Sequence, residues 1–346
     1  MQNLKEKAVI DFLKSTKLAT SKEIHEAVFK DISYATVKRM LSKMLVDGAL
    51  SIQGNAKATK YEISTHYAFF VDINLDDYFK QEIDERIIQQ QFNFNLLTDV
   101  FVHHSLFTSS ELEQLSKLQQ QFQNNIAALS PNAFKKELER LAIDLSWKSS
   151  QIEGNTYSLL ETERLLIDKE TASGKTKDEA TMLLNHKDAL DFIIEHTDYV
   201  NPLSVSKIEN IHRLLVKELP IDKNIRKRRV GISGTNYKPL DNEHQIIEAL
   251  EKMCDLINLK TSVFEKALLA LVFISYIQPF ADGNKRTARI VSNAILMNYQ
   301  FCPLSFRTVD SIEYKKAMLV FYEQNNLSCF RQLFMSQYEF NVNTYF

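Results

Sequence analysis

The chain has 346 residues, 45% of them hydrophobic and 25% charged, with a formal net charge of −2 at neutral pH. These fractions exclude general disorder, and the length predicts two or three domains. With only 7 glycines and 6 prolines, long helices are expected rather than a sandwich or barrel of short strands. Three scattered cysteines predict neither a disulfide framework nor a zinc cluster. No segment is apolar enough to cross a membrane, so we expect a cytoplasmic protein with no membrane partner.

Residues 1–66 are predicted to form a small basic domain. The first 63 residues carry eleven Lys or Arg against seven Asp or Glu. Apolar spacing predicts helices over 4–15 and 21–28, the second capped by Ser21. A longer helix is expected to follow Ser33 and to end at Gly48, and the alternation around Gly54 then predicts a two-stranded ribbon.

This order of elements resembles a winged helix-turn-helix domain, in which the third helix reads DNA. The expected DNA contacts are Tyr34, Thr36, Lys38, Arg39 and Lys43 on that helix, with Lys57 and Lys60 on the wing. The alternative is a helical adaptor that docks a protein partner and whose basic residues form a solvated face.

The rest of the chain is predicted to be mainly α-helical, with a polar helical connector over 67–130 and a helical core over 131–346. Apolar residues recur at a spacing near 3.6 in eight core segments. These segments are 132–154, 158–168, 176–196, 204–219, 242–259, 262–277, 286–300 and 310–326. Residues 226–240 break the pattern with two glycines, β-branched residues and a proline, and they predict a β-hairpin.

The stretch SYIQPFADGNKRTARIVSNAIL, Ser275–Leu296, predicts a phosphate-binding site. An apolar run ends before Pro279, and a short loop containing Gly283 leads directly into a helix. That helix carries three cations near its start: Lys285, Arg286 and Arg289. Backbone N–H groups at a helix N-terminus, a glycine that permits close approach and nearby cations together favour phosphate. A carboxylate in such a loop, Asp282, suits Mg²⁺.

The same loop carries a resemblance to a known family. Its sequence QPFADGNKRTAR is similar to the Fic/Doc (Fido) signature H-x-F-x-[DE]-G-N-[GK]-R-x-x-R. The segment SSQIEGN, residues 149–155, resembles the inhibitory motif [ST]-x-x-x-E-[GN] of that family. The segment RVGISGTNYKP resembles the family's flap, which holds a target segment beside the nucleotide. The resemblance covers residues 131–340, and an N-terminal winged helix is a known companion of the Fic core.

The resemblance implies a protein that binds ATP and Mg²⁺ and transfers AMP to a hydroxyl group of a target protein. Asp282 would hold the metal, and residues 283–286 would cradle phosphates through backbone N–H groups. The implied nucleotide contacts are Gly283, Asn284, Lys285, Arg286, Arg289, Tyr237 and Tyr314. The implied regulatory motif consists of Ser149, Glu153 and Gly154. Glu153 would occupy the γ-phosphate position by pairing with Arg289, because a carboxylate and a triphosphate compete for one guanidinium.

Two positions depart from the family pattern. Gln278 stands where the family has a His that acts as general base, and Gln has no titratable proton. Losing a positioned base slows a reaction by about 10²–10⁴, while the phosphate cradle is retained. Lys285 stands where many AMP-transferring members have Gly. Either it reverses the nucleotide and presents the γ-phosphate, or it adds a phosphate contact. His212, on the helical segment IENIHRLL, is expected to be a packed histidine.

Three functions remain open. The first is an ATP-binding relative of the protein adenylyltransferases, autoinhibited through Glu153 and impaired by Gln278. The second is a DNA-binding transcription regulator, in a dimer, that uses the core as a nucleotide sensor. The third is residual catalysis, either removal of AMP or phosphoryl transfer directed by Lys285.

Overall fold

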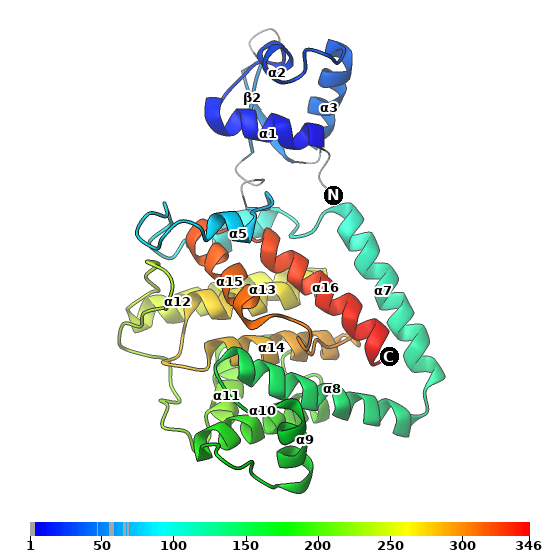
Figure 1. Ribbon diagram of the computed structural model, residues 1–346, viewed down its shortest axis with the longest axis vertical. Coiled ribbons are helices and arrows are strands. Elements are labelled where there is room, and N and C mark those ends of the chain that lie inside the picture. The colour runs from blue at the N-terminus through cyan, green and yellow to red at the C-terminus, as the bar shows by residue number, and fades with distance from the viewer. Residues whose placement is uncertain (1–3, 47, 55–58, 65–66, 68) are drawn as a thin grey trace. The chain divides into compact units, whose positions relative to one another are not determined.

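The computed structural model describes residues 4–346 apart from residues 47, 55–58, 65–66 and 68. The chain divides into two compact units, Met1–Asp72 and Ile73–Phe346 (Figure 1). This division differs from the predicted three parts, because residues 73–130 belong to the larger unit rather than to a separate connector. Long-range hydrogen bonds within that unit show why: Gln119 donates to the carbonyl of Gln300, and the Tyr338 hydroxyl bonds to Gln119.

The N-terminal unit contains the predicted three helices followed by a two-stranded antiparallel ribbon. The elements are α1 (Leu4–Thr16), α2 (Ser21–Val28), α3 (Tyr34–Val46), β1 (Leu50–Gln53) and β2 (Lys60–Ile63). In the ribbon, Leu50 lies opposite Ile63. The N-cap of α2 is Thr20 and not Ser21, because Thr20 and Glu23 bond to each other's backbone N–H groups in a capping box.

The larger unit is helical, and it contains all eight helices predicted for the core. Its elements are α5 (Leu75–Tyr78), a π-helical turn (Leu96–Val100), α6 (Phe101–His103), α7 (Ser109–Ala128), α8 (Pro131–Ile152), α9 (Leu159–Asp168), α10 (Lys177–Glu195), α11 (Val205–Leu215), α12 (Glu243–Leu259), α13 (Val263–Ile277), α14 (Asn284–Asn298), α15 (Ser311–Gln324) and α16 (Ser328–Thr344). The last helix, α16, was not predicted. None of the helices among the described residues is both long and apolar enough to pass through a membrane.

Helix α13 lies at the centre of the larger unit. Every residue from Phe264 to Ile277 is buried. Helix α14 runs alongside α13, and α8, α10 and α11 also pack on α14 (Figure 1). The polar first turn of α14 is therefore held between an apolar central helix and the C-terminal end of α8.

The hairpin predicted over 226–240 is absent from the structure. Among the described residues, the paired strands are β1 and β2, and the segment makes only an isolated bridge between Lys238 and Gln91. The guanidinium of Arg226 instead donates to the carbonyls of Gln278, Arg228 and Leu240. Backbone groups that would form a ladder are thus bonded to a buried side chain and to other parts of the unit. We call residues 226–240 the flap segment.

Candidate functional site

The loop between α13 and α14 is shaped by two residues in the left-handed region. Gln278 ends α13 with φ 52°, and Gly283 begins α14 with φ 82°. A Cβ atom added at Gly283 would lie 3.4 Å from the ring of His212. Glycine is favoured at position 283 by its backbone conformation, since the contact with the ring is an ordinary van der Waals distance.

Asn284 and His212 hold this loop in place. Asn284 accepts from the N–H of Phe280 at 2.8 Å and donates to its carbonyl at 2.8 Å. The Phe280 ring stacks on His212 with centroids 3.7 Å apart, and Nε2 of His212 donates to the carbonyl of Asp282 at 3.0 Å. Burial lowers the pKa of His212 to about 4, so the ring is neutral near pH 7. His212 is packed, as expected, and it also supports the loop.

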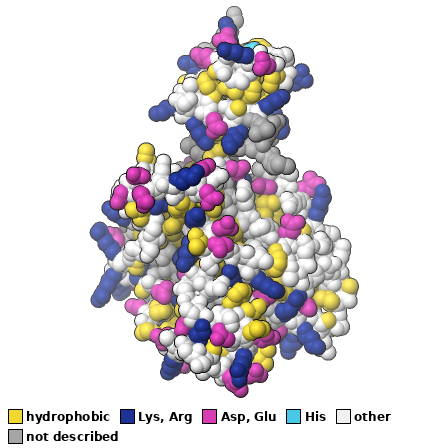
Figure 2. Space-filling model, viewed as in Figure 1, with side chains coloured by type: hydrophobic (Ala, Val, Ile, Leu, Met, Phe, Trp, Pro, Cys, Tyr) yellow, Lys and Arg dark blue, Asp and Glu magenta, His cyan; other side chains and the backbone are white. Residues whose placement is uncertain are grey.

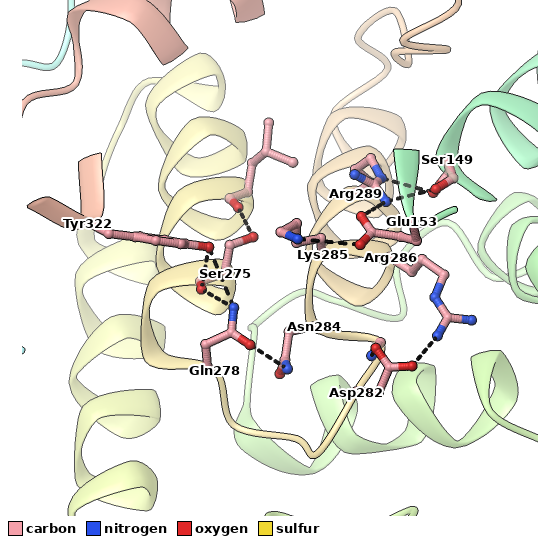
Figure 3. Close-up of polar contacts among 12 residues, drawn as sticks. Ser149, Glu153, Ser275, Gln278, Asp282, Asn284, Lys285, Arg286, Arg289 and Tyr322 are labelled. Atoms are coloured by element: carbon pink, nitrogen blue, oxygen red, sulfur yellow. Dashed lines mark hydrogen bonds and ion pairs between the residues drawn. The ribbon is translucent and has the colours of Figure 1, made fainter. Parts of the chain in front are cut away.

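The first turn of α14 forms a cationic cradle. Its N-cap, Gly283, offers no side-chain cap, so the first N–H groups of the helix remain available to an anion. Asp282 accepts from the N–H of Gly283 at 2.6 Å and lies 3.3 Å from Nη2 of the buried Arg286 (Figure 3). Two further nitrogens of Arg286, Nε and Nη1, are buried and make no hydrogen bond within the described residues.

Glu153 lies across this cradle at the end of α8. Its Oε1 accepts from Arg289 at 2.9 Å, and its Oε2 accepts from Lys285 at 3.3 Å (Figure 3). Burial acts to raise the pKa of Glu153, but the charges of Arg289 and Lys285 outweigh it and hold the pKa below its ordinary value. Arg289 is fully buried and also donates to the hydroxyl of Ser149 at 2.8 Å. Gly154, with φ 100°, allows the chain to turn directly after Glu153.

The side-chain amide of Gln278 is engaged on both sides. Its Nε2 donates to the carbonyl of Ser275 at 2.7 Å, and its Oε1 accepts from Asn284 at 2.9 Å (Figure 3). The Tyr322 hydroxyl donates to the same carbonyl of Ser275 at 2.8 Å. Gln278 therefore acts as a structural tie between α13 and the loop.

These residues surround a cavity of about 310 Å³, a volume in the range of small-molecule sites. It is lined by Glu153, Val230, Gly231, Ile232, Ser233, Gln278, Ala281, Asp282, Asn284, Lys285, Lys315, Met318, Leu319 and Tyr322. The sequence interpretation did not include Lys315 or Tyr322. The spacing of Lys315, Leu319 and Tyr322 along α15 is that of one helix face, and this signal could have identified them.

Of the seven predicted nucleotide contacts, Asn284 and Lys285 line the cavity, whereas Gly283, Arg286, Arg289, Tyr237 and Tyr314 do not. Tyr237 is buried, its hydroxyl donates to the carbonyl of Tyr276, and its ring stacks with those of Tyr276 and Tyr322. We call these three residues the tyrosine stack. Tyr314 is also buried, with Arg289 lying 5.2 Å from its ring centroid. The rings of both tyrosines are packed in the core, next to Tyr276 and Arg289 respectively, and do not face the cavity.

The side chains present fit a nucleoside triphosphate with Mg²⁺. The uncapped N-terminus of α14 and Lys285 on the cavity wall suit phosphate oxygens. Within the described part of the chain, no three His, Cys, Asp or Glu residues are placed to hold a metal together. Asp282 would therefore supply one ligand, and phosphate oxygens and water would complete the shell, as Mg²⁺ prefers.

The predicted DNA contacts are distributed over α3 and β2. The Tyr34 hydroxyl bonds to Ser21 at 2.8 Å, Lys38 lies over the Tyr34 ring, and Lys43 is 3.4 Å from Glu6. Thr36, Arg39 and Lys60 are exposed, and Lys57 lies outside the described residues. Figure 2 shows basic and acidic side chains interspersed over the visible surface.

Comparison with known proteins supports the interpretation of the loop. Residues 202–296 match the model of the Fic/DOC family. This segment is therefore similar to a Fic/DOC domain. The match includes Gln278, Asp282 and the α14 cations, whereas Glu153 precedes it.

The similar curated proteins are protein adenylyltransferases. Protein adenylyltransferase fic-1 of Caenorhabditis elegans is 27% identical over 179 residues, which cover 49% of this chain and 34% of that protein. Protein adenylyltransferase Fic of Nematostella vectensis is 30% identical over 185 residues, covering 49% and 40%. The chain therefore spans between a third and two fifths of the length of these relatives.

Solved structures agree on the fold. A Fic-domain-containing signaling protein from Bacteroides thetaiotaomicron has a TM-score of 0.57 at 21% identity, covering 66% of this chain and 94% of that one. Fic-1 from C. elegans, residues 134–508, has a TM-score of 0.57 at 22% identity, covering 68% and 72%. At these identities the likeness concerns the fold alone.

Proposed function

We propose that the Fic/DOC domain of this chain binds ATP with Mg²⁺, that Glu153 restrains it, and that Gln278 impairs transfer of AMP to protein hydroxyls. The observation that carries the proposal is the position of Glu153, whose two carboxylate oxygens are bonded to Arg289 and Lys285 beside the uncapped helix N-terminus. Phosphate oxygens would make the same charge-assisted bonds once Glu153 moved aside.

The roles of the chain's own residues follow from their chemistry. The N–H groups at the start of α14, with Lys285, would orient the phosphates, and Asp282 would hold Mg²⁺, which when bound neutralises charge on the phosphate oxygens. AMP transfer requires that a hydroxyl oxygen bond to the α-phosphorus, that pyrophosphate leave and that the hydroxyl proton pass to a base. Gln278 cannot accept that proton, and its amide oxygen already accepts from Asn284.

The test uses four forms of the protein with ATP labelled at the α- or γ-phosphate. The forms are the unmodified chain, Glu153→Gly, Gln278→His and the double variant. We expect α-label on protein only when His is present, and more of it when Glu153 is removed. Label with Gln278 in place would overturn the impaired-base part of the proposal, and γ-label would favour phosphoryl transfer directed by Lys285.

A second candidate is a DNA-binding regulator whose Fic/DOC domain senses nucleotide. Its support is the solvent-exposed, basic outer face of α3, which includes Lys38 and Arg39, opposite a buried face of Val37, Leu41 and Met44. Sequence-selective DNA binding that weakens as salt increases would support it. Absence of DNA binding at low salt would exclude it.

A further inference from the structure

A segment that is distant in sequence from the cavity residues contacts the flap segment, part of which lines the cavity. Residues 79–93, which we call the strap, follow α5 and have no helix or paired strand of their own. Arg86, in the middle of the strap, donates through Nη2 to the carbonyl of Gly234 at 2.7 Å. Gly234 directly follows residues 230–233, which line the cavity. The strap thus contacts the flap segment at the residue where the cavity wall ends.

Further bonds join the strap to the flap segment. The Asn236 side chain donates to Asp84 at 2.9 Å, and the N–H of Lys238 donates to the carbonyl of Gln90 at 2.8 Å. Arg86 is 8% exposed, whereas Asn236 is exposed. Of the side-chain bonds between the strap and the flap segment, the one made by Arg86 is therefore better protected from water. The flap segment has no β-ladder of hydrogen bonds within itself, and its bonds to the strap satisfy part of its backbone instead.

The strap also binds α15, which lines the cavity as well. Arg86 Nη1 lies 3.2 Å from the carboxylate of Glu323, a residue only 1% exposed. Glu323 follows Tyr322, which lines the cavity. Figure 1 shows α15 beside α5, on which it packs. One guanidinium therefore contacts both Gly234, next to the 230–233 wall, and Glu323 of α15.

The energetics favour a positioning role over a stabilising one. Arg86 Nε and Nη1 and Glu323 Oε1 are buried and make no hydrogen bond with the described residues, and Glu323 Oε2 accepts from the Tyr78 hydroxyl at 2.6 Å. A buried ion pair with incomplete hydrogen bonding gains little net stability, and replacing both partners by apolar residues of similar size is often neutral or stabilising. What such a pair supplies is a defined geometry. At Gly234 that geometry is tight, because a Cβ atom there would lie 3.2 Å from the Leu319 side chain.

We propose that Arg86, through Glu323 and Gly234, is a positioning residue for the nucleotide cavity and increases its affinity for ATP. The proposal rests on the proposed function, since ATP is the ligand assumed. Arg86 does not line the cavity, so its effect would pass through the wall at 230–233.

The experiment measures ATP binding by calorimetry in the Glu153→Gly background, with and without Arg86→Met plus Glu323→Met. We expect the paired substitution to weaken ATP binding about tenfold while the nucleotide-free protein stays folded at the temperature of the titration. Amide hydrogen exchange should increase at 230–234 and not in α13. Lys80→Met, in the same strap, removes an exposed ion pair with Asp77 of α5; it is the matched control and should leave ATP affinity unchanged.

The outcomes separate the two proposals. If Glu153→Gly binds no ATP, the proposed function fails. If it binds ATP, and the paired variant binds equally well with unchanged exchange at 230–234, the role of Arg86 is overturned. Arg86→Lys gives a second route should the paired variant not fold. Lysine keeps the charge near Glu323 but lacks the fork that reaches Gly234 as well, so weaker ATP binding is again expected and equal binding overturns the proposal.

Discussion

Replacing Glu153 by Gln removes the anion between Arg289 and Lys285 while keeping the shape of the side chain. Glu153 accepts from Arg289 at 2.9 Å and from Lys285 at 3.3 Å. A hydrogen bond to a charged group contributes about 1.5–3 kcal/mol, and the 19% exposure of the Glu153 side chain reduces this to about 1–2 kcal/mol. Each kcal/mol shifts the melting temperature of a domain of this size by about 2–4 °C, so we expect a fall of about 2–8 °C without nucleotide.

The same substitution should enlarge the stabilisation that ATP provides, because Arg289 then lacks an anion that phosphate can supply. Thermal unfolding followed by fluorescence, with and without Mg²⁺ and ATP, measures both effects. Glu163→Gln is the matched control, since Glu163 is an exposed carboxylate on the neighbouring helix α9. An unchanged melting temperature together with an unchanged ATP shift would refute the assignment of Glu153 as the anion that fills the cradle.

Three other substitutions test the site and its surroundings. Gly283→Ala forces a non-glycine residue into φ 82° and should lower the free energy of unfolding by about 1–2 kcal/mol in denaturant titration. Ser149→Ala leaves Arg289 Nε buried without its acceptor and should cost about 1–3 kcal/mol, whereas Ser150→Ala, whose hydroxyl has no partner among the described residues, should cost nothing. Hydrogen bonds from the Thr156 side chain and the Thr176 N–H lower the pKa of Glu179 from 4.5 to about 2. Glu179→Gln should therefore lower the free energy of unfolding by its full amount above pH 4.5, and this loss should diminish to nothing as the pH falls towards 2. A loss that does not depend on pH would contradict this.

The loop from Gln278 to Arg289 could be predicted because its information is local. Turn chemistry at Gly283 and the spacing of the cations depend only on neighbouring residues. The order of helices could be predicted for the same reason, because apolar periodicity is a property of each segment alone. The missed helix α16 carries a similar signal in Phe330, Phe334, Tyr338 and Val342, which recur every fourth residue.

The features that the sequence did not predict depend on contacts between distant parts of the chain. Nothing near Tyr237 in sequence indicates that its ring stacks on Tyr276. The sequence therefore predicted a nucleotide contact at a position that is buried in the core. The β-branched residues of the flap segment predicted a hairpin, but its carbonyls accept from the side chains of Arg226 and Arg86 instead of from a partner strand. That Glu153 and Lys285 would be bonded to each other was likewise not readable from their spacing.

The tyrosine stack gives the protein a built-in optical reporter. Burial raises the pKa of the hydroxyls of Tyr237, Tyr276 and Tyr322 above the ordinary value of 10.0. Their protonated form is favoured only in the folded state, so the associated stability is present below pH 10 and is lost as the pH rises further. Exposed tyrosines ionise first in an alkaline titration, and the three stacked rings become phenolates only when the packing behind the cavity opens. Burial also raises the pKa of Tyr314, Tyr338 and Tyr345, so ultraviolet absorbance at alkaline pH reports, without a label, the opening of the core to which the stack belongs.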